Sequence, residues 1–489
     1  MLNKLKKTLK HTAIYSLGNL SAKIVGFLLL PLYLEYLTTE EYGILAILEV
    51  TTQILFGIFS MSISTAMLRW CSDDKDVLNH KRIVFSSLIT TLGLIAVLNI
   101  CFLPFSNFLS SALFSSEKFS LYIILMVVSA SFNVLNTIPL SLIRLLEKPA
   151  FFTVITSLRF TLVLLLNVFF IVELNYGVEG ILISQIIGNI VLFAVCLPLL
   201  FRNMIPKTEM TVIKEMLKYG GPLVVSTISG TLLSFGDRYI LNAFLSLSSV
   251  GIYSLGYKIA SVIKIFLLQS FQLGFLPIAF KNLNTKGSDR FFSKVHTYFV
   301  FIMLILSLVL SLYAQEVILM MSDKTEYFEA YKIVPIISLA FVFTGMRYVY
   351  ALGFHFTKKT KYNAYIVGVG AALNIGLNII FIPIFGYIGS AISMVIAVGL
   401  MTLLSFIYSQ KQYYISYEQK KTVLQILTAI GLYLVSLLFN EIQMFNRLIL
   451  KTLLLISFPI ILYFLNFYEE IELQRIKEFF QKVRDKINV

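Results

Sequence analysis

Long apolar stretches alternate with short charged segments along the whole chain. Each apolar stretch is about 20 residues long, which is the length of α-helix that crosses the ~30 Å hydrocarbon core of a membrane. The pattern therefore predicts an all-α polytopic membrane protein with about 14 transmembrane helices. The predicted spans cover roughly residues 12–37, 43–68, 83–105, 119–143, 150–173, 179–201, 217–245, 251–279, 292–314, 329–353, 362–385, 387–409, 422–440 and 447–467.

The composition supports a membrane protein. Of the 489 residues, 58% are hydrophobic and 13% are charged, whereas soluble proteins carry about 25% charged residues. The formal net charge of +14 would suggest nucleic-acid binding in a soluble protein. Here the charges lie between the apolar stretches, so we expect no nucleic-acid partner.

The lysines and arginines lie mostly on one side of the predicted membrane. With the N-terminus inside, the segments on that side hold 28 of the 40 Lys and Arg residues, and the loops on the other side hold only Lys118, Lys324 and Arg447. Cytoplasmic loops of membrane proteins carry such an excess of positive charge. Both termini are therefore predicted to be cytoplasmic, and most of the net charge reports topology rather than ligand binding.

Two pairs of similar segments lie about 210 residues apart. Residues 34–44 resemble residues 241–252, and residues 166–180 resemble residues 377–389. Six spans separate the copies, so both have the same orientation, as in a parallel repeat. We predict two six-helix lobes related by this repeat and followed by an accessory helix pair. The predicted domains are an N-terminal lobe over 1–210, a C-terminal lobe over 211–415, the accessory pair over 416–468, and a cytoplasmic interfacial helix over 469–489.

The sequence lacks the common signatures of soluble enzymes. It contains no GxxxxGK[ST], HExxH or GxSxG motif, which would mark a nucleotide site, a zinc protease or a serine hydrolase. Cys71, Cys101 and Cys196 show no CxxC spacing, so neither a disulfide framework nor a zinc site is indicated. We therefore expect no enzymatic activity, no catalytic residue, no cofactor and no metal.

Charged residues inside the spans are the candidates for function. A charge within the membrane is costly and normally faces an aqueous cavity or a partner. Seven charged residues lie inside the predicted spans, and five of them are cationic. This excess of positive charge favours an anionic substrate in a central cavity. The predicted substrate-binding residues are Lys23, Arg159, Arg238, Lys258 and Lys264, and the two acidic residues are Glu49 and Asp237.

Other roles stay open for the same residues. Asp237 is either an ion-coupling residue or the structural partner of Arg238 or Lys258. Glu49 either pairs with a lysine or binds a coupling cation. In the eighth span, a regular helix of 100° per residue places Lys258, Ser261, Lys264, Gln269 and Gln272 within about 140°, which is typical of a helix that lines a water-filled cavity.

Several segments resemble a known family. They are residues 15–23, Leu29-Leu-Pro-Leu-Tyr33 with residues 37–43, and Gly236-Asp-Arg-Tyr-Ile240 leading to Val250-Gly-Ile-Tyr253. These resemble the polysaccharide-transporter (oligosaccharide flippase) family of the multidrug/oligosaccharidyl-lipid/polysaccharide exporter superfamily. The resemblance implies two six-helix lobes around a cavity lined by spans 1, 2, 7 and 8, and alternating access in the bacterial cytoplasmic membrane. The accessory helix pair is seen in some members, and in lipid II flippases it forms a lipid-facing groove.

The resemblance also implies a function in surface polysaccharide export, for example of O-antigen or capsule. The expected cargo is a lipid-linked oligosaccharide on polyprenyl pyrophosphate, moved from the inner to the outer leaflet. The expected partners are this cargo, membrane lipids, and a polysaccharide polymerase or glycosyltransferases. Two alternatives are a cation-coupled multidrug exporter of the same fold and a membrane scaffold for glycan-assembly enzymes.

Overall fold

A computed structural model describes residues 26–73, 76–283, 285–470, 472–474 and 478. The described part is helical, and 12 of its helices are long and apolar enough to cross a membrane. A shorter apolar helix, Gly26–Tyr36, falls on the first predicted span, and α9 with α10 falls on the seventh. The fold class of a polytopic α-helical membrane protein is confirmed, and the described part of each of the roughly 14 predicted spans is largely helical.

The chain divides into two compact units that do not follow a single cut in the sequence. The first unit comprises residues 1–254, 320–327 and 374–390, and the second comprises residues 255–319, 328–373 and 391–489. The predicted lobe boundaries at 210 and 415 stay a prediction. The interfacial helix predicted over 469–489 lies largely outside the described residues.

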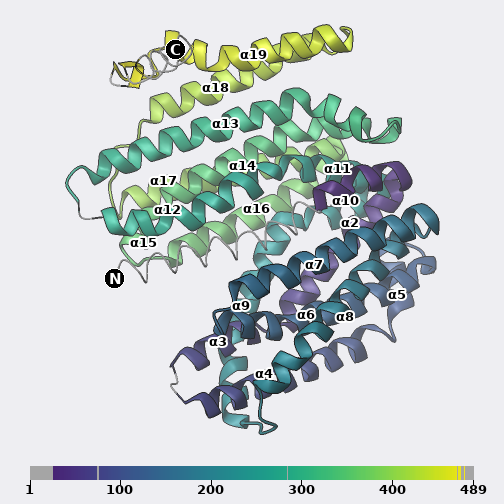
Figure 1. The fold of residues 1–489 in the computed structure, drawn as a ribbon. Helices are drawn as coiled ribbons and strands as arrows, with labels where there is room; N and C mark the ends of the chain where they lie inside the picture. The colour runs from purple at the N-terminus through teal and green to yellow at the C-terminus, as the bar shows by residue number, and fades with distance from the viewer. Residues whose placement is uncertain (1–25, 74–75, 284, 471, 475–477, 479–489) are drawn as a thin grey trace, which may run out of the picture. The chain divides into compact units, whose positions relative to one another are not determined.

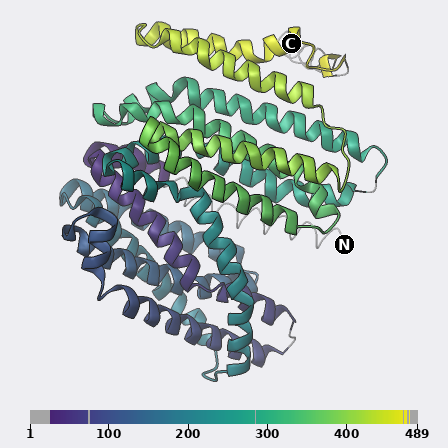
Figure 2. The same ribbon diagram turned by 180° about the vertical axis from the view of Figure 1, so that it is seen from behind.

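Figures 1 and 2 show the helices from opposite sides. Within the first 254 residues they are α2 (Thr39–Phe59), α3 (Ile63–Asp73), α4 (Val77–Phe102), α5 (Ser106–Phe114), η1 (Glu117–Phe119), α6 (Ser120–Leu145), α7 (Pro149–Val168), η2 (Phe169–Glu173), α8 (Gly177–Arg202), α9 (Met210–Phe235), α10 (Asp237–Phe244) and the first part of α11 (Leu247–Ala260). They continue with η3 (Ile263–Leu268), α12 (Gln269–Asn282), α13 (Ser288–Met321), η4 (Thr325–Lys332), α14 (Ile333–Tyr350), α15 (Leu352–Phe356), α16 (Lys361–Phe385), α17 (Tyr387–Gln410), α18 (Gln419–Ser436), η5 (Leu437–Phe439) and α19 (Met444–Phe464).

Local sequence signals fix where several helices begin. The Thr38 side chain accepts a hydrogen bond from the Glu41 backbone N–H while the Glu41 carboxylate accepts one from the Thr38 N–H, which is a complete capping box at the start of α2. Asp76 caps α4 through the Leu78 N–H. Pro149 occupies the first turn of α7, where its missing N–H costs no helical hydrogen bond.

The first unit packs two repeat-equivalent segments directly against each other. A Cβ atom at Gly43 on α2 would lie 1.9 Å from the Leu247 carbonyl oxygen, and one at Gly251 on α11 would lie 2.0 Å from the Thr39 carbonyl oxygen. Each glycine thus meets the carbonyl four residues before the other. Such a reciprocal contact is expected where two segments are related by a two-fold axis, and here the backbones touch.

Two departures from regular helix near the candidate charges were not predicted. The seventh predicted span is divided into α9 and α10 at Gly236, directly before Asp237. The eighth is divided into α11, the π-helix η3 and α12. Because a π-helix has i→i+5 hydrogen bonds, the 100° register does not hold from Lys258 to Gln272. The prediction of a polar face about 140° wide assumed a regular helix, and the chain does not form one over these residues.

Candidate functional site

The structure joins two of the predicted charges. Arg238 Nη1 lies 2.6 Å from Asp237 Oδ1, and both side chains are 4% exposed. Tyr253 on α11 donates a hydrogen bond to Asp237 Oδ2, and Ser390 on α17 lies 3.4 Å from the same oxygen. The Arg238 guanidinium also lies 5.0 Å from the ring centroid of Phe235. These contacts give both charges buried partners, as a structural pair requires, while a substrate role for Arg238 stays a prediction.

Two further candidates lie in the first unit on different helices. Glu49 on α2 has an exposed side chain. Arg159 on α7 is partly buried, with its guanidinium carbon 5.1 Å from the Phe160 ring centroid. Among the described residues, no protein group forms a hydrogen bond with the buried Arg159 Nε. A cation of this kind within a span is suited to an anionic ligand.

The remaining candidates lie in the second unit or outside the described residues. Lys258 and Lys264 are both partly buried. Lys264 lies in the π-helix η3, and π-helical turns frequently occur at functional sites. Lys23 lies outside the described residues. The six described candidates are thus divided between the two units, four in the first and two in the second.

A buried ion cluster in the second unit was missed in the sequence. Glu316 on α13 lies 2.7 Å from Arg447 Nε and 2.8 Å from Lys451 Nζ, both on α19. The three side chains are only 3–8% exposed. Lys451 lies inside a predicted span, so the rule that intramembrane charges matter should have selected it. We call this group the Glu316 cluster.

A second ion cluster lies near the other end of α13, where it connects this helix to residues next to α18 and α19. Lys294 lies 3.0 Å from Glu418 Oε1, which precedes α18, and 2.7 Å from Glu469 Oε1, which follows α19. Thr297 donates a hydrogen bond to Glu418 Oε2, and Lys421 lies 3.1 Å from Glu418 Oε1. We call this group the Lys294 cluster. The hairpin of α18 and α19 is thus attached to α13 by ionic contacts at both of its ends.

The Lys294 cluster predicts a pH dependence of stability. Burial raises the pKa of Glu418, but hydrogen bonds from Thr297, Lys294 and Lys421 outweigh it, and the net pKa lies below the ordinary value of 4.5. Because the folded pKa is depressed, the stabilisation is complete above pH ~4.5 and is lost as the pH falls through the folded pKa. We expect Glu418→Gln to lower the thermal unfolding midpoint in detergent at pH 7.

The control for this measurement is Glu441→Gln, because the Glu441 side chain is exposed. It should leave the midpoint unchanged at either pH. The difference between the wild type and Glu418→Gln should shrink as the pH falls below ~4.5. A difference that persists unchanged at lower pH would show that the loss comes from packing rather than from the ionised carboxylate.

Two of the three cations assigned to outside loops form polar contacts with other residues of the protein. Lys324 Nζ donates to the Leu37 carbonyl oxygen at 3.0 Å, and Tyr327 Oη donates to the Thr38 carbonyl oxygen at 2.8 Å. These contacts satisfy carbonyls just beyond the end of the helix Gly26–Tyr36, where intrahelical partners are lacking. Arg447 belongs to the Glu316 cluster.

The fold matches solved structures of membrane transporters. A structure described as the lipid II flippase MurJ in an inward closed conformation aligns with a TM-score of 0.71 at 16% identity, over 92% of this chain and 99% of that chain. A multidrug resistance MATE family transporter of the MOP superfamily aligns in its inward-facing conformation with a TM-score of 0.63 at 16% identity, over 81% of this chain and 94% of that chain. The outward-facing conformation of such a transporter gives 0.58 at 16% identity, over 83% and 95%. At these identities the likeness establishes the fold.

The sequence comparison establishes the family. No curated protein matches the chain as a close relative in sequence. A family model described as "Polysaccharide biosynthesis protein" matches residues 8–283, which is more than half of the chain. The protein is therefore a multi-pass membrane protein that belongs to the polysaccharide biosynthesis protein family.

Proposed function

We propose that the protein is a flippase for a lipid-linked oligosaccharide and not an enzyme. It moves a polyprenyl-pyrophosphate glycan from the inner to the outer leaflet of the bacterial cytoplasmic membrane by alternating access. Both termini lie in the cytoplasm, and a polymerase or glycosyltransferases act on the same glycan. The single observation that carries this proposal is the family match over residues 8–283. The likeness to a lipid II flippase over 92% of the chain supports it.

Buried cations suit the anionic part of this cargo. Arginine and lysine form strong charge-assisted hydrogen bonds with phosphate oxygens. Arg159, whose Nε has no hydrogen-bond partner among the described residues, and Lys264 in η3 are our proposed pyrophosphate contacts. The membrane potential supplies a driving force, because ~2.3 kcal/mol per charge is gained per 100 mV when negative charge moves outward across the whole field.

The charges also favour this proposal over cation-coupled drug export. Such an exporter needs an acidic residue that is available to a cation. Of the two acidic candidates, Asp237 is already bound by Arg238 and Tyr253, which leaves Glu49 as the only candidate for this role. A scaffold without transport activity would not depend on cations in the spans, so the following experiment separates the flippase from both alternatives.

Arg159→Ala and Lys264→Ala should each slow translocation of a fluorescent lipid-linked oligosaccharide in proteoliposomes by about 10-fold or more. Hydrogen bonds to charged groups contribute about 1.5–3 kcal/mol, and 1.4 kcal/mol corresponds to a factor of about ten. Lys214→Ala is the control, because Lys214 is an exposed lysine on α9. Translocation at the wild-type rate in both variants would exclude the proposed pyrophosphate contacts. No translocation by the wild type would contradict the flippase function itself.

A further inference from the structure

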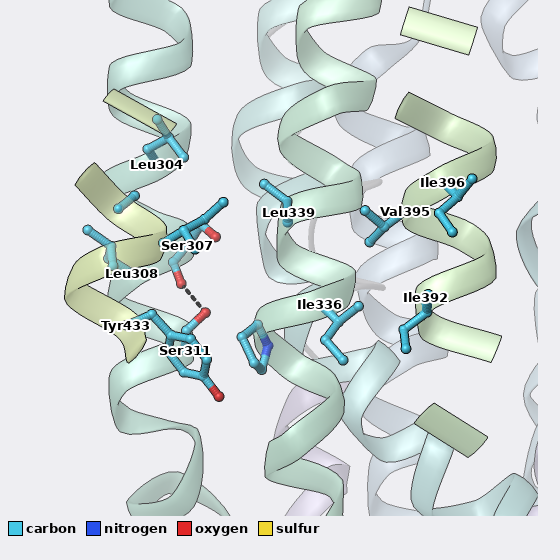
Figure 3. A pocket seen from close by; sticks show the side chains of 13 residues that line it. Leu304, Ser307, Leu308, Ser311, Ile336, Leu339, Ile392, Val395, Ile396 and Tyr433 are labelled. Carbon is cyan, nitrogen blue, oxygen red and sulfur yellow. Dashed lines mark hydrogen bonds between the residues drawn. The ribbon is translucent and has the colours of Figure 1, made fainter. Parts of the chain in front are cut away.

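An apolar cavity lies within the second unit between α13, α14, α17 and α18. Its volume is about 230 Å³, and Figure 3 shows side chains from these helices around it. Most of its wall is aliphatic, including Leu304, Leu339 and Val395. Because the cavity lies among four helices that are long and apolar enough to cross a membrane, its surroundings are lipid hydrocarbon rather than water.

Water is a poor occupant of this cavity. A buried water needs two to four polar partners, whereas apolar cavities of about 150 Å³ stay dry and bind small hydrocarbons. The hydroxyl of Ser311 in the wall donates to the Ser307 carbonyl oxygen of its own helix at 2.6 Å. The wall thus offers few free polar partners, and its chemistry selects a hydrocarbon.

The cavity communicates with the surface that faces the bilayer. Two of its wall residues, Ile396 on α17 and Ile430 on α18, are 42% and 36% exposed. Exposed isoleucines on membrane-spanning helices contact lipid chains, so a chain can enter past them. The Lys294 cluster attaches the beginning of α18 to α13, and the Glu316 cluster attaches α19 to α13, which helps to keep the wall formed by α18 in place.

Two of the three hydroxyl-bearing side chains of the cavity wall lie at one end. Ser311 and Tyr433 lie close together at that end, whereas Leu304 and Ile396 lie at the other (Figure 3). Ser311 precedes Glu316 by five residues, or about 7.5 Å along the helix, so the polar end lies nearest the Glu316 cluster, and Glu316 lies just beyond the predicted end of its span at residue 314. A lipid whose headgroup is at this boundary would extend its chain toward Leu304.

We propose that this cavity binds one acyl chain of a bilayer phospholipid from the leaflet next to the Glu316 cluster. In the orientation that the Lys and Arg distribution predicts, this is the outer leaflet. The ester region of the lipid lies near Ser311 and Tyr433, and the end of the chain lies among Leu304, Leu339 and Ile396. The site lies on residues of the second unit alone and does not depend on the translocated substrate.

The test uses the full chain in nanodiscs that contain a phospholipid with a diazirine near the end of one acyl chain. After irradiation, mass spectrometry should find adducts concentrated on residues 304–311 and 392–396. Leu339→Trp fills the cavity and should abolish these adducts. Leu427→Trp is the matched control, because Leu427 is 61% exposed on α18, and it should leave them unchanged. Val395→Phe provides a second, smaller filling variant if Leu339→Trp does not fold.

Three results would overturn the proposal. The first is adduct formation on the wall residues no greater than on exposed lipid-facing residues such as Leu427. The second is labelling that both filling variants leave unchanged. The third is labelling of the wall by a diazirine-bearing polyprenyl phosphate but not by the phospholipid, which would assign the cavity to the carrier lipid instead.

Discussion

Glu316→Ala is expected to lower the free energy of unfolding by about 3–5 kcal/mol, because removal of one partner from a buried ion cluster leaves uncompensated charge. The substitution strands Arg447 and Lys451, which are both more than 90% buried beside it. The separation of α19 from α13 is the expected structural result. Unfolding in mixed micelles of increasing SDS content measures the change, and a cysteine-reactivity assay on an introduced α19 cysteine reports the separation.

The matched control is Glu329→Ala, which breaks an exposed pair between Glu329 and Lys332 whose side chains are 46% and 39% accessible. Pairs of this kind contribute about 0.3–0.5 kcal/mol. A third variant combines Glu316→Leu, Arg447→Met and Lys451→Leu. Because it removes all three charges, it should be close to the wild type in stability. If Glu316→Ala costs no more than Glu329→Ala, the cluster does not hold α19.

The apolar runs were sufficient to predict the fold class and the positions of the 12 long apolar helices among the described residues. The length of these runs is set by the thickness of the membrane. The spans can therefore be recognised in the sequence without knowledge of tertiary contacts. Departures inside the spans were not predictable in this way. The break at Gly236 and the π-helix over 263–268 change hydrogen bonding without a change in hydropathy. The 100° rule consequently does not apply along the whole of the eighth span.

The charge rule located part of the candidate site. It selected Asp237 and Arg238, which the structure joins, and it offered the structural pair as one of two interpretations. It did not select Glu316, because this residue lies just beyond the predicted ninth span and 135 residues before its partner Lys451. Pairing between such distant residues depends on the packing of helices, which one sequence does not reveal.

The contact between Gly43 and Gly251 should be a sensitive packing position in the first unit. Gly43→Ala places a Cβ atom where the Leu247 carbonyl oxygen lies 1.9 Å away, and backbone atoms cannot rotate aside as a side chain can. α2 and α11 must therefore move apart. Overpacking of this kind costs about 1–3 kcal/mol, and the midpoint of thermal unfolding in detergent should fall accordingly.

Gly93→Ala is the control that isolates this contact from helix propensity. Gly93 lies within α4, and a Cβ atom there would have no neighbour within 4 Å. Alanine in a helix interior is favoured over glycine by about 1 kcal/mol, so Gly93→Ala should raise the midpoint. The same substitution thus has opposite signs at the two positions. A rise in the midpoint for Gly43→Ala would contradict the close approach of the two backbones.

The reciprocity of the contact makes a further prediction about the double variant. Gly251→Ala alone should cost about as much as Gly43→Ala, because its Cβ atom would meet the Thr39 carbonyl oxygen at 2.0 Å. Once the first alanine has separated the helices, the second enters space that is already open. Residues in direct contact are coupled by about 0.5–3 kcal/mol. The double variant should therefore lose clearly less stability than the sum of the single variants, whereas two independent contacts would give full additivity.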